Sequence, residues 1–177
     1  MTVSVAEYAR ECAAQGLRGN YSICRPDFTV MQDYAYSDAE QKVWRMLCER
    51  QTRLTRRLAH RAYLDGVDAL GLLERIPDFG EVSERLRRLT GWEIVAVPGL
   101  IPAQPFFEHL AARRFPVTNW LRSEKELDYI VEPDMFHDFF GHVPILTQPV
   151  FADFMQAYGA RAGEAIALGG DEMITRL

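Results

Sequence analysis

Two of the four histidines lie five residues apart in the run EPDMFHDFFGHVP, residues 132–144. Their imidazoles are side chains that could bind one metal ion together. On an ideal helix, residues at i and i+5 point about 140° apart, whereas residues at i and i+4 share a face. Both His137 and His142 can therefore reach one ion only if the helix ends between them. Gly141 and Pro144 provide such a break.

The same pair has a purely structural interpretation, in which one histidine is a hydrogen-bonded core residue and the other stabilises a helix C-terminus. The phenylalanines around them favour metal binding, because an imidazole buried among aromatic rings needs a ligand or a hydrogen-bond partner. Asp134 and Asp138 are interleaved with the histidines. Two imidazoles and one carboxylate form the facial triad of non-haem Fe(II) oxygenases. A zinc hydrolase is the alternative, which the five-residue spacing and the lack of a nearby general-base motif disfavour.

The elements that must position these residues are mostly helical. Ser37 and Glu40 form a capping box that opens an amphipathic helix running to Gly66, with an apolar face of Val43, Leu47, Leu54 and Leu58. Further helices are expected from Asp78 to Gly91, from Pro105, over 134–140 and over 149–158.

Extended segments are expected over 92–97, before the break at Pro98-Gly99, and over 115–121. The expected fold class is therefore mainly α, with minor β. We expect an irregular N-terminal arm over residues 1–36 and a single domain over 37–177.

Composition narrows the possible partners and the compartment. The net charge of −5 and the pI near 5.4 give no reason to expect a nucleic-acid or anionic-membrane partner. The arginines between residues 50 and 61 fit the solvated face of a helix. Cys12, Cys24 and Cys48 are odd in number and form no CxxC pair, which indicates a reducing compartment. No signal peptide and no 18-residue apolar stretch is evident, so we expect a cytoplasmic protein.

Several runs together resemble the catalytic domain of the aromatic amino-acid hydroxylases, and most closely the bacterial phenylalanine 4-hydroxylases. They are VWRMLCERQ, VAVPGLIPAQPFFEHLAARRFPVTNWLR, LDYIVEPDMFHDFFGHVP and PVFADFMQAYG. The resemblance extends from about residue 25 to the end of the chain. It implies the helical catalytic domain of that family, incomplete at the C-terminus.

The resemblance implies roles for individual residues. His137 and His142 would be the two iron ligands, and Asp138 would support the first of them as a third catalytic residue. Tetrahydropterin would be held by a turn and its surroundings, namely Gly99, Leu100, Ile101, Ala103, Phe106 and Glu132. Phe106 would stack on the pterin ring, although its position also fits the core face of an amphipathic helix.

The substrate site is implied in the same way. Arg122 matches the arginine that binds the substrate α-carboxylate, a task that suits a bidentate guanidinium, although by itself it fits a surface arginine equally well. Ile130, Val131 and Pro133 would line the substrate pocket.

The implied reaction is the 4-hydroxylation of L-phenylalanine to L-tyrosine, with tetrahydrobiopterin or a related tetrahydropterin, O2 and Fe(II). The complete enzyme is expected to be a monomer. The choice among phenylalanine, tyrosine and tryptophan stays open. The alternative is a catalytically inactive pterin- or amino-acid-binding fragment of the same family.

In this family the third iron ligand is a glutamate on a later helix, and we expect the chain to stop before it. We therefore expect weak Fe(II) binding and uncovered core faces. Glu164, Asp171 and Glu172 could replace the missing ligand, but no spacing supports them.

Overall fold

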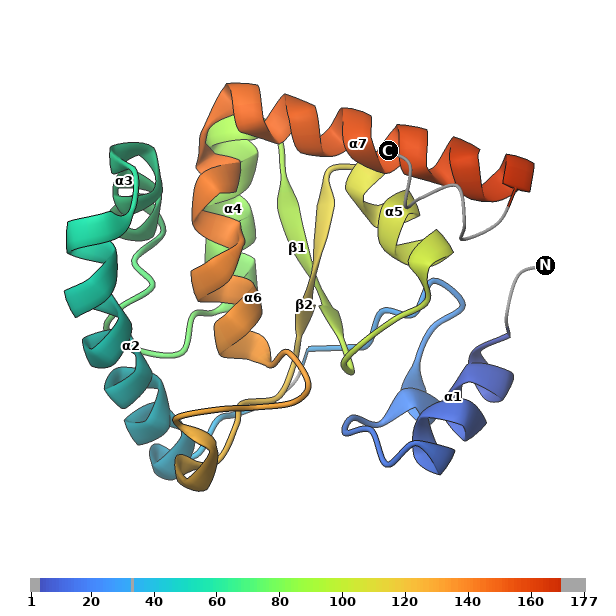
Figure 1. Ribbon diagram of the computed structural model, residues 1–177, viewed down its shortest axis with the longest axis horizontal. Coiled ribbons are helices and arrows are strands. Elements are labelled where there is room, and N and C mark those ends of the chain that lie inside the picture. The colour runs from blue at the N-terminus through green and yellow to red at the C-terminus, as the bar shows by residue number, and fades with distance from the viewer. Residues whose placement is uncertain (1–3, 33, 170–177) are drawn as a thin grey trace.

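The computed structural model describes residues 4–32 and 34–169 as seven α-helices around a two-stranded sheet (Figure 1). The helices are α1 Val5–Ala14, α2 Asp38–Leu58, α3 Arg61–Leu70, α4 Phe79–Thr90, α5 Ala103–Ala111, α6 Met135–Gly141 and α7 Pro149–Gly169. The strands are β1 Glu93–Val97 and β2 Arg114–Thr118, and the short 3-10 helices are η1 Tyr21–Ile23, η2 Glu124–Glu126 and η3 Val143–Thr147. The predicted class, mainly α with minor β, is confirmed.

The two strands run parallel, and α5 makes the crossover between them. Glu93 pairs with Arg114 at one end, and Val97 pairs with Thr118 at the other. Both strands therefore finish at the same edge, which we call the carboxyl edge. In parallel sheets the segments that follow this edge commonly form ligand sites. Here those segments are the turn 98–101 and residues 119–122.

The core beside this sheet is aromatic and is organised by α6. Phe136 and Phe139 meet the ring of Trp44 edge-on, with centroids 5.2 and 6.1 Å away. Phe79 meets Phe139 at 5.1 Å, and Trp44 and Phe139 are fully buried. One face of α6 is thus buried in the core.

The ends of two helices follow the predicted capping chemistry. Ser37 and Glu40 form the capping box of α2. The Asp78 side chain accepts a hydrogen bond from the Glu81 backbone N–H at the start of α4, and Gly91 ends that helix at φ 76°. These predictions are confirmed. They could be made from sequence because a helix cap and a helix end depend on neighbouring residues.

The prediction of one continuous helix as far as Gly66 is wrong. The chain is extended at Ala59, with φ −80° and ψ 150°, and His60 then caps α3 by accepting a hydrogen bond from the backbone N–H of Ala62. Leu54 and Leu58, expected in the core, are 52% and 80% exposed. The apolar spacing continues across the break, so periodicity could not locate it.

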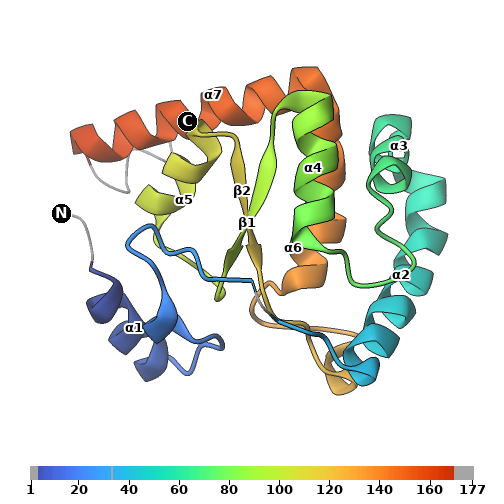
Figure 2. The ribbon, with the colours of Figure 1, turned by 180° about the vertical axis from the view of Figure 1, so that it is seen from behind.

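Three other elements differ from their predicted extents. The N-terminal arm contains α1, which a Ser4–Glu7 capping box opens, rather than irregular chain. Helix α5 begins at Ala103, before Pro105. Helix α7 continues past Tyr158 to Gly169, and both views show it lying across α4, the strands and α5 at one end of the molecule (Figure 2).

All three cysteines are free thiols. None of the helices within the described ranges combines the length and apolarity that crossing a membrane requires.

Candidate metal and cofactor site

The two histidines of the EPDMFHDFFGHVP run are brought together at the end of α6. Their Nε2 atoms are 3.1 Å apart, and their ring centroids are 4.9 Å apart. Helix α6 ends at Gly141, and His142 leaves the helix with φ −120° and ψ −43°. The predicted break between the two histidines is therefore present, and it unites side chains that a continuous helix would separate.

The separation of these nitrogens fits a pair of metal ligands. Two nitrogens at right angles around an octahedral ion, each about 2.1 Å from it, lie about 3.0 Å apart. The same distance also fits an N–H···N hydrogen bond between two neutral imidazoles of opposite tautomer.

The expectation that these imidazoles are buried among phenylalanines is wrong. His137 and His142 are exposed residues, because Phe136, Phe139 and Phe140 occupy the core face of α6. The His142 ring still packs against Phe115, with centroids 5.8 Å apart. Partial desolvation of the ring, followed by the neighbouring His137, lowers the pKa of His142. The neutral form that binds metals is thereby favoured.

Within residues 4–32 and 34–169, no three His, Cys, Asp or Glu side chains lie close enough together to hold a metal ion. Glu164, one of the possible replacement ligands, forms an ion pair with Arg161 at 2.9 Å. Asp171 and Glu172 lie outside the described residues.

Asp134 organises the entry into α6 and holds Arg122. Its carboxylate accepts hydrogen bonds from Nε and Nη2 of Arg122 at 2.8 and 2.9 Å, and from the backbone N–H of His137 at 3.0 Å. The side chain of Asp134 is fully buried, and that of Arg122 is 12% exposed. Arg122, predicted to bind a substrate carboxylate, thus engages two of its five N–H groups internally.

Asp138 attaches α6 to the carboxyl edge of the sheet. Its Oδ2 accepts a hydrogen bond from the backbone N–H of Thr118, the last residue of β2, at 2.8 Å. Burial raises the pKa of Asp138 to about 7, although the Thr118 bond opposes that rise. The carboxyl group therefore fixes the helix that carries His137.

The turn after β1 is tightly enclosed by its surroundings. Gly99 is buried with φ 155°, and a Cβ added there would lie 2.7 Å from Oη of Tyr21. Such a close approach requires glycine. The indole N–H of Trp120 donates to the carbonyl of Pro98 at 2.9 Å, which joins the turn to the segment after β2.

The other predicted cofactor residues differ in their accessibility. Leu100 is 44% exposed, and Ile101 and Ala103 are half-buried. Phe106 is also half-buried and meets Phe107 edge-on at 5.4 Å, so part of its ring remains accessible.

The segment before α6 contains one buried carboxylate. Glu132 is 8% exposed, its Oε2 accepts a hydrogen bond from the Arg18 backbone N–H at 2.8 Å, and its Oε1 has no partner among the described residues. Ile130 and Pro133 are half-buried, whereas Val131 is exposed.

Comparison with known proteins places this arrangement in a family. The sequence profile of the biopterin-dependent aromatic amino acid hydroxylases matches residues 21–177, which is most of the chain. The chain belongs to this family.

Individual relatives agree with the match to the hydroxylase family. The chain is 79% identical over 175 residues to a phenylalanine-4-hydroxylase of Mesorhizobium japonicum, covering 99% of this chain and 64% of that protein. It is 52% identical over 155 residues to the Caulobacter vibrioides protein of the same name, covering 86% and 53%. The chain thus spans less than two thirds of these relatives.

A solved structure supports the same relationship. The phenylalanine hydroxylase of Chromobacterium violaceum, with bound iron(III) and the oxidised cofactor 7,8-dihydrobiopterin, superimposes with a TM-score of 0.81 at 48% identity. The match covers 92% of this chain and 58% of that one.

Sequence reasoning missed several residues that contact the candidate site. Arg18 and Tyr21 contact Glu132 and the turn from the N-terminal segment, and Trp120 bonds the turn from the other strand. These contacts join positions far apart in the chain. No local pattern in the sequence marks them.

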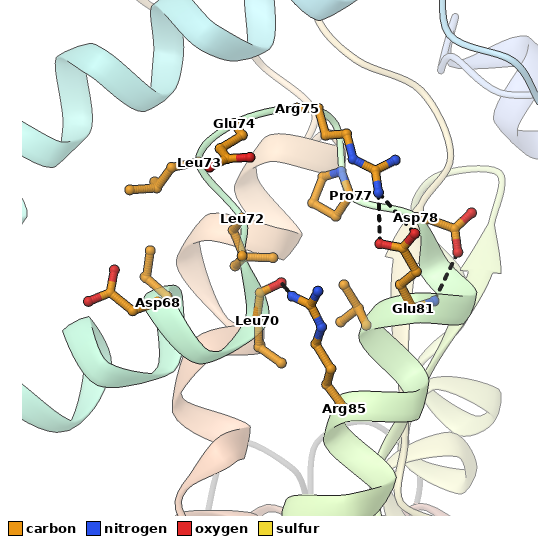
Figure 3. Close-up of a pocket in the computed structure, with 13 residues that line it drawn as sticks. Asp68, Leu70, Leu72, Leu73, Glu74, Arg75, Pro77, Asp78, Glu81 and Arg85 are labelled. Carbon is orange, nitrogen blue, oxygen red and sulfur yellow. Dashed lines mark hydrogen bonds and ion pairs between the residues drawn. The ribbon is translucent and has the colours of Figure 1, made fainter.

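A cavity of about 480 Å³ lies elsewhere in this chain, between the end of α3, the following loop and α4 (Figure 3). An ion pair between Arg75 and Glu81, at 2.8 Å, borders it, and Arg85 donates to the carbonyl of Leu70 at 2.6 Å. None of the predicted site residues lines this cavity, so it is separate from the carboxyl edge.

Proposed function

We propose that this chain contains the catalytic region of a phenylalanine 4-monooxygenase, which hydroxylates L-phenylalanine to L-tyrosine with O2, tetrahydropterin and non-haem Fe(II). The observation that carries the proposal is the histidine pair, with its 3.1 Å separation of Nε2 atoms at the end of α6, beside β2. The 79% identity to a protein named phenylalanine-4-hydroxylase supports the choice of substrate. Residues 37–177 would form the catalytic part, with residues 1–36 as an N-terminal arm.

His137 and His142 would hold Fe(II) through their Nε2 atoms. When bound, Fe(II) supplies the redox chemistry that activates O2, and the tetrahydropterin supplies electrons. Asp138 would be a positioning residue for this pair, since it fixes α6 to the last residue of β2.

Arg122 would orient the substrate through its α-carboxylate. Asp134 holds the guanidinium in one plane through two hydrogen bonds, so little conformational entropy would be lost when a second carboxylate binds. Ile130, Val131 and Pro133 would provide the neighbouring wall for the phenyl ring.

The tetrahydropterin would lie against Gly99, Leu100, Ile101 and Ala103, with Phe106 stacked on its ring. Peptide groups of a glycine-containing turn can approach a flat heterocycle closely. Glu132 would face the same site. Its Oε1, which has no partner within residues 4–32 and 34–169, is a buried acceptor that a ring N–H or an ordered water could satisfy.

The test is phenylalanine-dependent formation of tyrosine with Fe(II), tetrahydrobiopterin and O2. Three proteins would be compared: this chain, the M. japonicum relative, and this chain joined to the part of that relative which it does not cover. If the joined protein forms tyrosine and this chain does not, the remaining metal ligand comes from outside the described residues. Absence of tyrosine in the joined protein, beside an active relative, would overturn the proposal.

The alternative is a protein that binds pterin or an amino acid without turnover. The lack of a three-ligand metal group among the described residues favours it. Binding of 7,8-dihydrobiopterin without tyrosine formation in any of the three proteins would support this alternative.

We further propose that the complete enzyme is a cytoplasmic monomer without nucleic-acid or membrane partners. Sedimentation of the joined protein would test its oligomeric state.

A further inference from the structure

The N-terminal segment makes a set of contacts with the turn 98–101 that the hydroxylase assignment does not explain. We propose that residues 8–21, here called the clamp segment, position this turn and Glu132 for pterin binding. The inference rests on the proposed function. Nearly all of the clamp segment precedes residue 21, where the match to the family profile begins.

The closest contact is between two backbones. Gly19 has φ 99°, and a Cβ added there would lie 2.0 Å from the carbonyl oxygen of Pro98. The lack of a side chain therefore allows the clamp segment to lie directly on the turn.

Two tyrosines contact the next residues of the turn. The Tyr8 hydroxyl donates to the carbonyl of Leu100 at 3.2 Å. The Tyr21 hydroxyl lies beside Gly99, and the two tyrosine rings meet edge-on with centroids 5.6 Å apart. Three successive turn residues are thus each contacted by a different residue of the clamp segment.

Arg18 extends these contacts to the other side of the proposed pterin site. Its backbone N–H donates to Glu132, and its guanidinium lies 5.2 Å from the ring centroid of Trp120, whose indole N–H bonds the turn. The guanidinium also forms an ion pair with Glu126, with Nη1 3.1 Å from Oε2. One segment therefore fixes both the turn and the buried carboxylate, which would lower the entropic cost of ligand binding.

Two glycines of the clamp segment provide a matched test. Gly16 and Gly19 both have positive φ, 69° and 99°, but a Cβ at Gly16 would meet no atom of the described residues within 4 Å. Gly16→Ala and Gly19→Ala thus both place a Cβ at positive φ, while only the second displaces the clamp segment from the turn. Binding of 7,8-dihydrobiopterin to this chain would be measured by calorimetry, without turnover.

We expect Gly19→Ala to raise the Kd about tenfold or more, and Gly16→Ala to change it less than about twofold. Co(II) binding at His137 and His142 should stay the same in both variants, because the clamp segment does not contact them. Equal Kd values for the two glycine variants would overturn the inference.

Tyr8→Phe gives an independent test if Gly19→Ala does not fold. It removes one hydroxyl and keeps the ring, so we expect a Kd increase of about three- to tenfold with at most a small fall in Tm. A wild-type Kd in Tyr8→Phe would count against the clamp. If neither the wild-type chain nor the joined protein binds dihydrobiopterin, the proposed function fails and the inference fails with it, whereas binding that is equal in all variants overturns the inference alone.

Discussion

His137 and His142 reach a common point because they belong to two different backbone conformations. His137 is helical, while His142 follows the last residue of α6 and directly precedes the 3-10 helix η3. Since both side chains are exposed, a metal ion can reach them from solvent without any rearrangement of the core.

We therefore expect either His137→Ala or His142→Ala to weaken Co(II) binding by roughly 100-fold, because a single imidazole cannot chelate. Absorption titration with Co(II) would measure the effect. His60→Asn is the matched control, since Asn keeps an acceptor at the α3 N-cap. Unchanged Co(II) affinity in both alanine variants would rule out the histidine pair as the metal site.

The carboxylate of Asp134 is buried and paired with Arg122, so its substitution should affect stability. Asp134→Asn keeps an N-cap acceptor for α6 but leaves the Arg122 guanidinium without its counter-charge. We expect a loss of about 3 kcal/mol in the free energy of unfolding, measured with urea. Asp128→Asn removes the exposed partner of Arg50 and should change stability little. Equal stability of the two variants would contradict the prediction.

At the scale of elements, the junction between α3 and η3 depends on a glycine. A Cβ on Gly66 would lie 2.1 Å from the carbonyl oxygen of Pro144. A Cβ on Gly163 in α7 would meet no atom within 4 Å in the part of the chain that the structure describes. We expect Gly66→Ala to lower the free energy of unfolding by about 1–3 kcal/mol through overpacking. Gly163→Ala should instead raise it by about 0.5–1 kcal/mol through helix propensity. Thermal unfolding would measure both variants. A change in the free energy of unfolding with the same sign in the two would contradict this packing argument.

Sequence alone predicted those elements whose limits are set by neighbouring residues. Ser37 with Glu40, Asp78 and Gly91 mark helix ends through local hydrogen bonds or positive φ, and the structure has them. The interruption at Ala59–His60 was missed because the apolar spacing continues across it, although the His60 side chain caps α3 locally. The parallel pairing of β1 with β2 is a contact between distant segments.

The candidate site divides in the same way. Gly141 and Pro144 made the helix end between the histidines predictable. The hydrogen bonds between Asp134 and Arg122 could not be predicted, because they depend on the position of β2 relative to α6. The contacts of the clamp segment join residues up to 114 positions apart in the chain. Local sequence contains no information on such pairs without knowledge of the fold.

At the scale of the whole molecule, the ion pair between Arg18 and Glu126 joins the N-terminal segment to the region before α6. Hydrogen bonds from Arg18, and then from Ser123, lower the pKa of Glu126 to about 2 from its ordinary value of 4.5. A lowered folded-state pKa stabilises the protein above the unfolded-state pKa, and this contribution is lost as the pH falls towards the folded-state value.

Glu126→Gln should therefore lower the free energy of unfolding near neutral pH by less than about 1 kcal/mol, since the pair is partly exposed. The difference from wild type should shrink as the pH falls from about 5 towards 2. Urea unfolding at pH 7, 4 and 3 would measure it. A difference that stays constant across this range would show that the ion pair does not contribute as described.

The bond between Trp120 and Pro98 also has an optical consequence. Trp44 and Trp92 are fully buried, while Trp120 is half-buried, bonded to the turn and covered by a guanidinium. Iodide should therefore quench the fluorescence of Trp120 preferentially, and Trp120→Phe should abolish most of that quenching. The chain thus contains an intrinsic fluorophore at the carboxyl edge, whose emission would report movement of the turn without any attached label.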